Sequence, residues 1–386
     1  MAGLYLHIPF CASRCIYCGF YSTTHSNLQQ TYVNALCHEL ELRRNYLSSC
    51  VQKQDEAIPL ISTIYIGGGT PSQLLPQQIN QIFSTIGQLY FHDDEAFMAS
   101  TCEITMECNP DDITPEFAQF IQTTPINRIS MGVQTFSNQR LKFLHRRHKA
   151  EDIAPAVALL RKYGIYNISI DLMFGFPQQT LADWEYDIWQ ALVLHVEHIS
   201  AYSLMYEEGT PLFQLKQRGR VQEINEDLSL AMYQTLVTQL KEAGYEHYEI
   251  SNFALTGMQS QHNSSYWKSI PYLGIGASAH SYNIESRQWN VSDVNEYISS
   301  IQQDKPSFQW EYLDSDTRYN DLITTALRTS RGICISQLEP KYRHYMCKQA
   351  QKNIALHLLE IKDGYLRLTP KGIYVSDAVM TDLIYV

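Results

Sequence analysis

The chain has 386 residues, of which 45% are apolar, and a formal net charge of −11 at pH 7. This length predicts two domains or one large barrel with an appendage, and the acidic balance disfavours a nucleic acid as the main partner. No apolar run reaches the roughly 18 residues that span a bilayer. Residues 1–6 lack a secretion signal, and nine cysteines without such a signal indicate a reducing compartment, so we expect a cytoplasmic protein.

The N-terminal half alternates between short β-rich segments and longer helical patterns, which is typical of parallel βαβ units. Between the strands, apolar side chains in residues 32–40 and 181–195 recur at helical spacing. Six such units predict an α/β protein with an incomplete barrel or a curved open sheet. The candidate strands are 4–8, 62–66, 102–107, 128–132, 167–172 and 198–203.

Polar and cysteine residues of distinctive type lie at or just after the ends of these strands. In β/α barrels the active site lies at the C-terminal ends of the strands. We therefore expect these side chains to share one rim. Cys11, Cys15 and Cys18 follow the first strand, residues 67–71 the second, Glu107 and Asn109 end the third, Gln134 the fourth and Asp171 the fifth.

The pattern changes after about residue 215. We expect a helix over 226–243 and a strand over 245–251, and a small helical-plus-β domain in the tail. The predicted regions are a barrel core over 1–215, a barrel extension over 216–290 that carries 262–267, and a C-terminal accessory domain over 291–386.

Cys11, Cys15 and Cys18 place three thiols within eight residues. A [4Fe–4S] cubane takes four ligands, so three protein thiolates leave one iron open to a small molecule. Enzymes that cleave S-adenosylmethionine (SAM) to a radical use this arrangement. Zinc is the alternative, but structural zinc favours paired C-x₂-C knuckles or histidine partners, and no second knuckle exists here. The other six cysteines are expected to be structural.

The triple glycine at 67–69 allows backbone amides to approach a ligand, because no Cβ stands in the way. Thr70 and Pro71 then predict the start of a helix, whose free N–H groups attract a carboxylate such as that of SAM. The alternative is a tight strand-to-helix turn without a ligand.

Glu107, Gln134, Arg146 and Asp171 form a second set of candidates. On one rim, a carboxylate can bind a ribose hydroxyl or an ammonium, and an arginine can bind a carboxylate. Each could instead be a structural polar group, and the basic run 145–149 could be a solvated helix end.

The segment His262-Asn-Ser-Ser-Tyr266-Trp267 has two interpretations. One is a loop with two aromatic side chains inserted into the core. The other is a flat apolar ligand site with an imidazole for an axial metal position, since neutral imidazole is a common iron ligand in heme proteins.

Together these motifs resemble the radical SAM superfamily and, within it, the HemN/HemW group, over residues 3 to about 380. The matching stretches are Tyr5–Cys11, the C-x₃-C-x₂-C triplet, residues 67–71, Glu107–Pro110, Gly132–Gln134 and Asp171–Gly175. The resemblance implies a (β/α)₆ partial TIM barrel with a small C-terminal accessory domain.

Two members of the group must be separated. The oxygen-independent coproporphyrinogen III dehydrogenase, a radical decarboxylase, carries another cysteine two residues after the triplet and an N-terminal arm. Here Phe20 occupies that position, and the chain begins almost at the first strand. Phe20 and the 262–267 motif are instead similar to HemW, a heme chaperone. The dehydrogenase stays the alternative, and a radical SAM enzyme acting on RNA is disfavoured by the acidic charge.

What the resemblance implies for this chain is a [4Fe–4S] cluster, SAM and heme as cofactors. It implies heme delivery to respiratory membrane proteins, a reductant such as flavodoxin or ferredoxin, and a cytoplasmic location with peripheral contact at the inner face of the membrane. Whether SAM is cleaved, and whether the chain is a homodimer, stay open. Gln178 departs from the glycine common in relatives, which predicts a modest loop change. The implied sites are Cys11, Cys15 and Cys18 for the cluster; Tyr5, Gly68, Gly69, Thr70, Glu107, Gln134, Arg146 and Asp171 for SAM; and His262, Tyr266 and Trp267 for heme.

Overall fold

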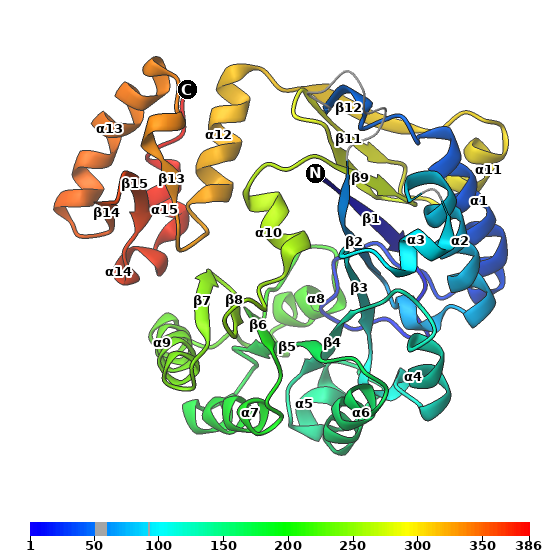
Figure 1. Cartoon of the computed structure of the whole chain (residues 1–386). Helices are drawn as coiled ribbons and strands as arrows, with labels where there is room; N and C mark the ends of the chain where they lie inside the picture. Colours follow the sequence, from blue (N-terminus) through cyan, green and yellow to red (C-terminus); the bar gives the residue numbers. More distant parts are fainter. Residues whose placement is uncertain (51–59, 92) are drawn as a thin grey trace.

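The computed structural model describes residues 1–50, 60–91 and 93–386, and shows an α/β fold (Figure 1). Six central strands pair in chain order, and every neighbouring pair is parallel. The predicted strands and the α/β class are confirmed. The central strands are β1 (Ala2–Ile8), β2 (Ile61–Gly68), β3 (Glu103–Cys108), β4 (Arg128–Gln134), β5 (Asn167–Phe174) and β6 (His198–Ser203).

Further strands extend this sheet at both edges. On one side β8 (Asn252–Ala254) pairs antiparallel with β6, and β7 (Glu246–Glu249) pairs with β8. On the other side β9 (Tyr272–Ile275) runs parallel to β1, and three antiparallel strands follow. These are β10 (His280–Tyr282), β11 (Ser286–Asn290) and β12 (Phe308–Tyr312). In the described ranges the sheet thus has twelve strands, in the order β12-β11-β10-β9-β1-β2-β3-β4-β5-β6-β8-β7.

The single strand expected over 245–251 is wrong, because the chain turns back after Glu249 to form a hairpin. The Glu249 carboxylate accepts the backbone N–H of Ser251 at 2.9 Å, which holds this turn. A side-chain-to-backbone bond of this kind competes locally with continued strand pairing.

Helices surround the central strands on the outside (Figure 1). Their apolar faces and the strands form one core; Leu4, Leu6 and Ile8 of β1, for example, are fully buried. Apolar residues alternate with Tyr5 and His7 in β1 and with Ser169 and Asp171 in β5, and this period of two makes both strands readable in the sequence. The helices are α1 (Gln29–Leu42), α2 (Pro76–Tyr90), α3 (Asp94–Met98), α4 (Pro115–Ile121), α5 (Asn138–Phe143), α6 (Ala150–Lys162), α7 (Leu181–Val193), α8 (Pro211–Gln217), α9 (Glu226–Glu242), α10 (Gln261–Trp267) and α11 (Val294–Gln302).

The C-terminal part has its own hydrophobic core, which begins at Tyr319 on α12 and ends at Leu383. It lies beside the large sheet, in orange and red in Figure 1. The predicted region boundary at 291 falls ahead of α11, whose Val294, Tyr297 and Ile301 belong to the main core, so the two cores divide only at α12. This part contains α12 (Ser315–Ala326), α13 (Pro340–Ala355), α14 (Pro370–Ile373), α15 (Ser376–Thr381) and the antiparallel strands β13 (Ile333–Cys334), β14 (Leu359–Lys362) and β15 (Tyr365–Leu368).

No helix in the described parts of the chain is both long and apolar enough to cross a membrane. All nine cysteines lie in these parts, and no two of them form a disulfide. Of the six cysteines outside the triplet, Cys37, Cys102 and Cys108 are buried, whereas the other three are only partly covered.

Candidate functional site

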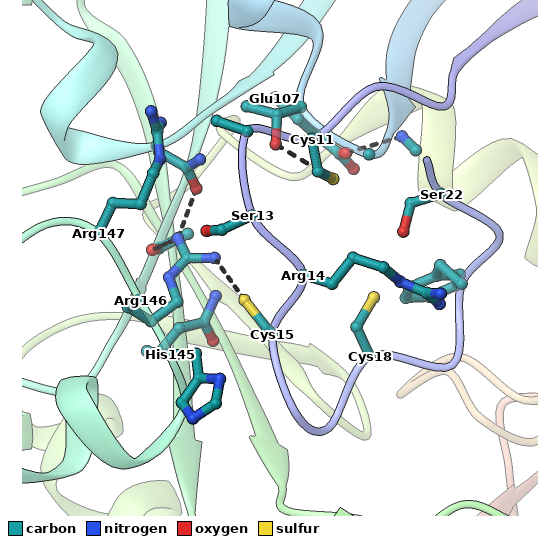
Figure 2. Close-up of a pocket in the computed structure, with 18 of the residues that line it drawn as sticks. Cys11, Ser13, Arg14, Cys15, Cys18, Ser22, Glu107, His145, Arg146 and Arg147 are labelled. Atoms are coloured by element: carbon teal, nitrogen blue, oxygen red, sulfur yellow. Dashed lines mark hydrogen bonds between the residues drawn. The ribbon is translucent and has the colours of Figure 1, made fainter. Parts of the chain in front are cut away.

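The predicted rim exists as a cavity of about 190 Å³ at the C-terminal ends of the parallel strands. The cysteine loop after β1 forms one wall, and the ends of β2 to β5 form the other. Figure 2 shows this loop with its three sulfur atoms turned toward the enclosed space. The predicted residues that line the cavity are Cys11, Cys15, Cys18, Gly68, Gly69, Thr70, Glu107, Gln134, Arg146 and Asp171.

The cysteine loop is held at its base and at its tip. At the base, Cys11 N–H donates to Thr23 O at 2.9 Å and Thr23 N–H donates to Pro9 O at 2.7 Å, which closes the loop like a short bridge between strands. At the tip, Ile16 is buried in a small apolar cluster, and its N–H donates to Leu144 O at 3.3 Å. Backbone hydrogen bonds and the burial of Ile16 therefore fix the position of the cysteine loop.

Two of the three thiols have polar side chains beside them that stabilise negative sulfur. Thr70 Oγ1 donates to Cys11 Sγ at 3.5 Å, and Arg146 Nη1 donates to Cys15 Sγ at 3.7 Å. Burial raises the pKa of the Cys11 and Cys18 thiols. Within the described residues, no three His, Cys, Asp or Glu side chains converge on one point as ligands of a single metal ion. Three soft donors around one cavity, with N–H and O–H donors to the sulfurs, fit a thiolate-held iron–sulfur cluster.

The triple glycine allows the end of β2 to pack directly on the cysteine loop. A Cβ at Gly69 would lie 2.8 Å from both Phe10 O and Pro9 C, and Gly68 has a φ of +113°, which other residues rarely adopt. The helix expected to open at Thr70 is wrong: Pro71–Gln73 forms a single 3-10 turn, and α2 begins only at Pro76.

The amides of this turn are bound within the protein. Gly69 N–H donates to Ile8 O and Thr70 N–H donates to Phe10 O, both at 2.8 Å, while Gly68 N–H donates to Glu107 Oε2 at 3.0 Å. The turn therefore shapes the cavity mainly through its lack of side chains.

Glu107 and Asp171 are half-buried carboxylates that face the cavity. Burial, with the negative charge of Asp171 nearby, raises the pKa of Glu107 to about 7, against the bonds from Tyr65 (2.8 Å from hydroxyl oxygen to Oε1) and Gly68. Burial also raises the pKa of Asp171 to about 6. Neither forms an ion pair with any residue in the described ranges. Two such carboxylates favour a cationic or hydroxyl-bearing ligand.

Arg146 is a half-buried part of the wall that bonds to protein groups, so the solvated-helix interpretation is wrong for this residue. Its Nη2 donates to Asn109 Oδ1 at 2.5 Å and to Gly132 O at 2.6 Å, besides the Nη1 contact with Cys15. Asn109 was noted only as a strand-end residue, and its pairing with Arg146 depends on the arrangement of β3 and β4.

A second cavity of about 580 Å³ adjoins the first and is lined by side chains of the central strands β2 to β6. It shares Glu107, Gln134 and Asp171 with the first cavity. Gln134 sits at a β-bulge with a φ of +67°, an outlier that turns the end of β4. Sequence reasoning missed Arg128, Tyr202 and Asn263 on this wall; only the even spacing of Arg128 and Gln134 along β4 signalled a shared face.

His262 lies in a different environment from the one expected. Residues 261–267 form α10 rather than a loop, and His262 is 1% exposed. Its Nδ1 hydrogen-bonds with Thr63 Oγ1 and its Nε2 with Tyr266 Oη, both at 2.8 Å. Since both ring nitrogens are engaged, the imidazole has no free position for a metal in this structure. Its ring stacks on Tyr65, the donor to Glu107, at 5.2 Å between centroids.

Three further predicted residues do not line the cluster cavity. Tyr5 hydrogen-bonds through its hydroxyl to His7 Nδ1 at 3.0 Å and stacks on Tyr65. Tyr266 supports His262, and Trp267 faces another cavity near the C-terminal part.

Comparison with known proteins agrees with this geometry. Residues 5–188 match the radical SAM superfamily. The chain is 34% identical over 344 residues to the heme chaperone HemW of Bacillus subtilis (strain 168), covering 89% of this chain and 87% of that protein. It is 30% identical over 387 residues to the heme chaperone HemW of Mycobacterium tuberculosis (strain ATCC 25618 / H37Rv), covering 99% and 94%.

Among solved structures, coproporphyrinogen III oxidase (HemN) from Escherichia coli, a radical SAM enzyme, superposes with a TM-score of 0.82 at 20% sequence identity. The match covers 99% of this chain and 90% of the other. At this identity the likeness shows the fold, and with it the radical SAM architecture of a mixed sheet surrounded by helices.

Proposed function

Because the chain belongs to the HemW family of radical SAM proteins, we propose that it is a heme chaperone, which binds heme and passes it to other proteins. The observation that carries the proposal is the likeness to these relatives over nearly the whole chain, together with Phe20 at the position where the dehydrogenase has a fourth cysteine. Membership of the superfamily implies a [4Fe–4S] cluster and SAM.

We propose that Cys11, Cys15 and Cys18 hold the cluster, which when bound supplies an electron to the SAM sulfonium. Thr70 and Arg146 stabilise the sulfur ligands, since each donates to a cysteine sulfur. Glu107 and Asp171 supply the negative charge that attracts the ammonium and ribose of SAM. Gln134 lies between the two cavities and orients the ligand there.

The proposed recipients of the heme are respiratory membrane proteins, and the proposed reductant is flavodoxin or ferredoxin. The proposed location is the cytoplasm, with peripheral contact at the inner face of the membrane. A transfer assay from heme-loaded chain to the apo form of such a recipient tests this part; a loaded chain that transfers no heme would contradict it.

The cluster is tested by anaerobic reconstitution with iron and sulfide. We expect Cys15→Ala to lose the brown absorbance and most of the bound iron, whereas Cys347→Ala, on α13 away from the cavity, keeps both. Wild-type iron and sulfide in Cys15→Ala would refute the ligand assignment.

The chaperone function is tested on the same material by titration with hemin and by an anaerobic assay with coproporphyrinogen III. Saturable hemin binding without decarboxylation is the expected result. Robust formation of protoporphyrinogen would identify the chain as the dehydrogenase instead.

A further inference from the structure

A cavity of about 490 Å³ lies between α10 and the C-terminal part, and it shares no lining residue with the two cavities at the sheet. One wall is the end of α10, which packs beside α12. The other is formed by α12, the turn that follows it, and strands β13 and β15. The volume lies in the range of ordinary small-molecule sites.

The walls of this cavity carry positive charge only. The chain has 40 acidic against 29 basic residues, yet none of the described residues that line the cavity is an aspartate or a glutamate. Lys268 and Arg331 both line it, and neither forms an ion pair within the described ranges. Arg331 Nη2 donates to the neutral Tyr365 hydroxyl at 2.6 Å, and its guanidinium lies over the Tyr365 ring, 4.9 Å from the centroid. Both cations are exposed at the cavity mouth, and with no carboxylate among the described lining residues they suit an anionic ligand.

Two buried donors next to the cavity also lack acceptors. Among the described residues, neither the indole Nε1 of Trp267 nor the Nε of Arg328 has a hydrogen-bond partner. Arg328 lies over the Trp267 ring, 5.3 Å from its centroid, and its Nη2 is 3.9 Å from Glu249 Oε2, so its charge is partly compensated. An unsatisfied buried donor is unfavourable by about 1–3 kcal/mol, and a ligand carboxylate that reaches these groups would supply the missing acceptor.

Part of the remaining lining suits a flat apolar ring, and the rest is neutral and polar: Gln259, Ser264, Thr329, Ser330 and Gln337. Trp267, Tyr248 and Tyr365 present aromatic surfaces, and Leu322 and Ile333 add aliphatic ones. A ligand for this cavity therefore combines a planar apolar body with carboxylates on its edge. A heme has this composition, because its macrocycle carries two propionate groups on one edge.

Cys334 is the only histidine or cysteine among the described lining residues. The Ser336 hydroxyl, whose Oγ is 3.4 Å from Cys334 Sγ, lowers the pKa of this thiol. Thiolate is an established axial ligand of heme iron.

We propose that this cavity, rather than the imidazole of His262, is the heme site: Trp267 packs against the macrocycle, Lys268 and Arg331 bind the propionates, and Cys334 ligates the iron. The proposal rests on the heme-binding function proposed above. It deepens that function by placing the heme apart from the cluster cavity, at the junction of the two hydrophobic cores.

The test titrates the full-length chain with hemin and with metal-free protoporphyrin IX, which keeps the ring and carboxylates but lacks iron. We expect the double variant Lys268→Gln/Arg331→Gln to bind both ligands at least tenfold more weakly, since it removes both cations that would bind the carboxylates. The matched control Lys241→Gln/Lys305→Gln removes the same net charge from the ends of α9 and α11 and should bind like wild type. Trp267→Phe, which keeps a ring but removes the indole N–H, should weaken both ligands severalfold.

The iron ligand is tested separately by Cys334→Ser. We expect a shifted Soret band for hemin, while metal-free protoporphyrin IX binds within twofold of wild type. An unchanged Soret band would overturn the assignment of Cys334.

The outcomes separate this proposal from the function on which it rests. No saturable hemin binding by the wild-type chain would refute the proposed function. Saturable binding by wild type that the Lys268→Gln/Arg331→Gln variant retains in full would refute this site alone. Far-UV circular dichroism and melting curves of each variant confirm that the comparison is made on folded protein.

Discussion

Glu39 on α1 is the centre of a buried polar network, and its removal is expected to destabilise the main core strongly. Its side chain is 0% exposed, and its Oε1 lies 3.1 Å from Arg43 Nη1. The carboxylate also accepts from Gly276 N–H at 2.9 Å, Tyr297 Oη–H at 2.7 Å and Asn290 Nδ2 at 2.8 Å. One charge thus connects α1, α11 and the segment around β9 to β11.

The expected magnitude for Glu39→Ala is about 3 kcal/mol of unfolding free energy. Removing one partner of a buried ion pair is unfavourable by about 3–5 kcal/mol, because the other charge stays buried without compensation. The lower end applies here, since Arg43 Nη2 keeps its bonds to Gln288 Oε1 at 2.8 Å and Ser281 Oγ at 3.2 Å. Glu39→Gln, which keeps the volume and part of the hydrogen bonding, should lose less.

Urea unfolding of the chain without cofactors, followed by tryptophan fluorescence, measures this change. The matched control is Glu41→Ala on the same helix, whose carboxylate is 61% exposed and, among the described residues, forms an ion pair with His38 alone. Such surface pairs contribute about 0–1 kcal/mol. A loss of less than about 1 kcal/mol for Glu39→Ala, with an unchanged dependence on urea, would refute the reasoning.

Three further predictions concern the site. Burial raises the pKa of Glu107 to about 7, so its charged form is lost as pH falls. SAM should therefore bind about tenfold more weakly at pH 6 than at pH 8, as measured by calorimetry. Glu107→Gln should flatten this pH dependence, and an equally steep profile in that variant would assign the titration to another group. Gly69→Ala places a Cβ 2.8 Å from Phe10 O and should lower the iron content after reconstitution at least twofold. The control is Gly164→Ala, where a Cβ meets no atom within 4 Å and only the backbone φ of +90° is strained; it should keep the wild-type iron content. Full iron content in Gly69→Ala would show that the cysteine loop shifts easily. His262→Ala should lower the unfolding free energy by about 1–3 kcal/mol, because the substitution removes two hydrogen bonds of a buried imidazole. It should leave the affinity for hemin within twofold, because it removes no heme contact. Loss of the Soret band in this variant would show that the imidazole ligates the heme iron.

The local sequence pattern predicted those parts of the structure that depend on residues close together along the chain. The central strands carry apolar residues at alternate positions, as Leu4, Leu6 and Ile8 do in β1. Their order along the chain is also their order in the sheet, so their ends meet at one rim. The cysteine loop was equally readable, because its three thiols are close in sequence and the loop closes on itself through Thr23 and Pro9. Glu107 and Asp171 came from the same rule, as polar residues at strand ends.

Whether a polar group binds a ligand or bonds within the protein depends on partners that are far away in the sequence. The amides at 68–70 were expected to face a ligand, but the approach of β1 supplies carbonyl acceptors for two of them and Glu107 takes the third. His262 was expected to belong to the heme site, with the axial ligand left open, but Thr63, on the adjoining β2, and Tyr266 hydrogen-bond with both ring nitrogens. A histidine is a ligand or a structural group according to which acceptors and donors surround it, and composition does not record them.

The sequence by itself determined the α/β class, the order of the six parallel strands and the identity of the three cysteines in the loop after β1. Tertiary structure alone decided that Arg146 contacts Cys15, that α10 buries its histidine, and that Lys268, Arg331 and Cys334 line one cavity. The physical reason is the separation along the chain of the residues that interact. Apolar periodicity and loop closure act between residues a few positions apart, whereas a hydrogen bond or a cavity wall requires two distant segments to pack in one particular orientation.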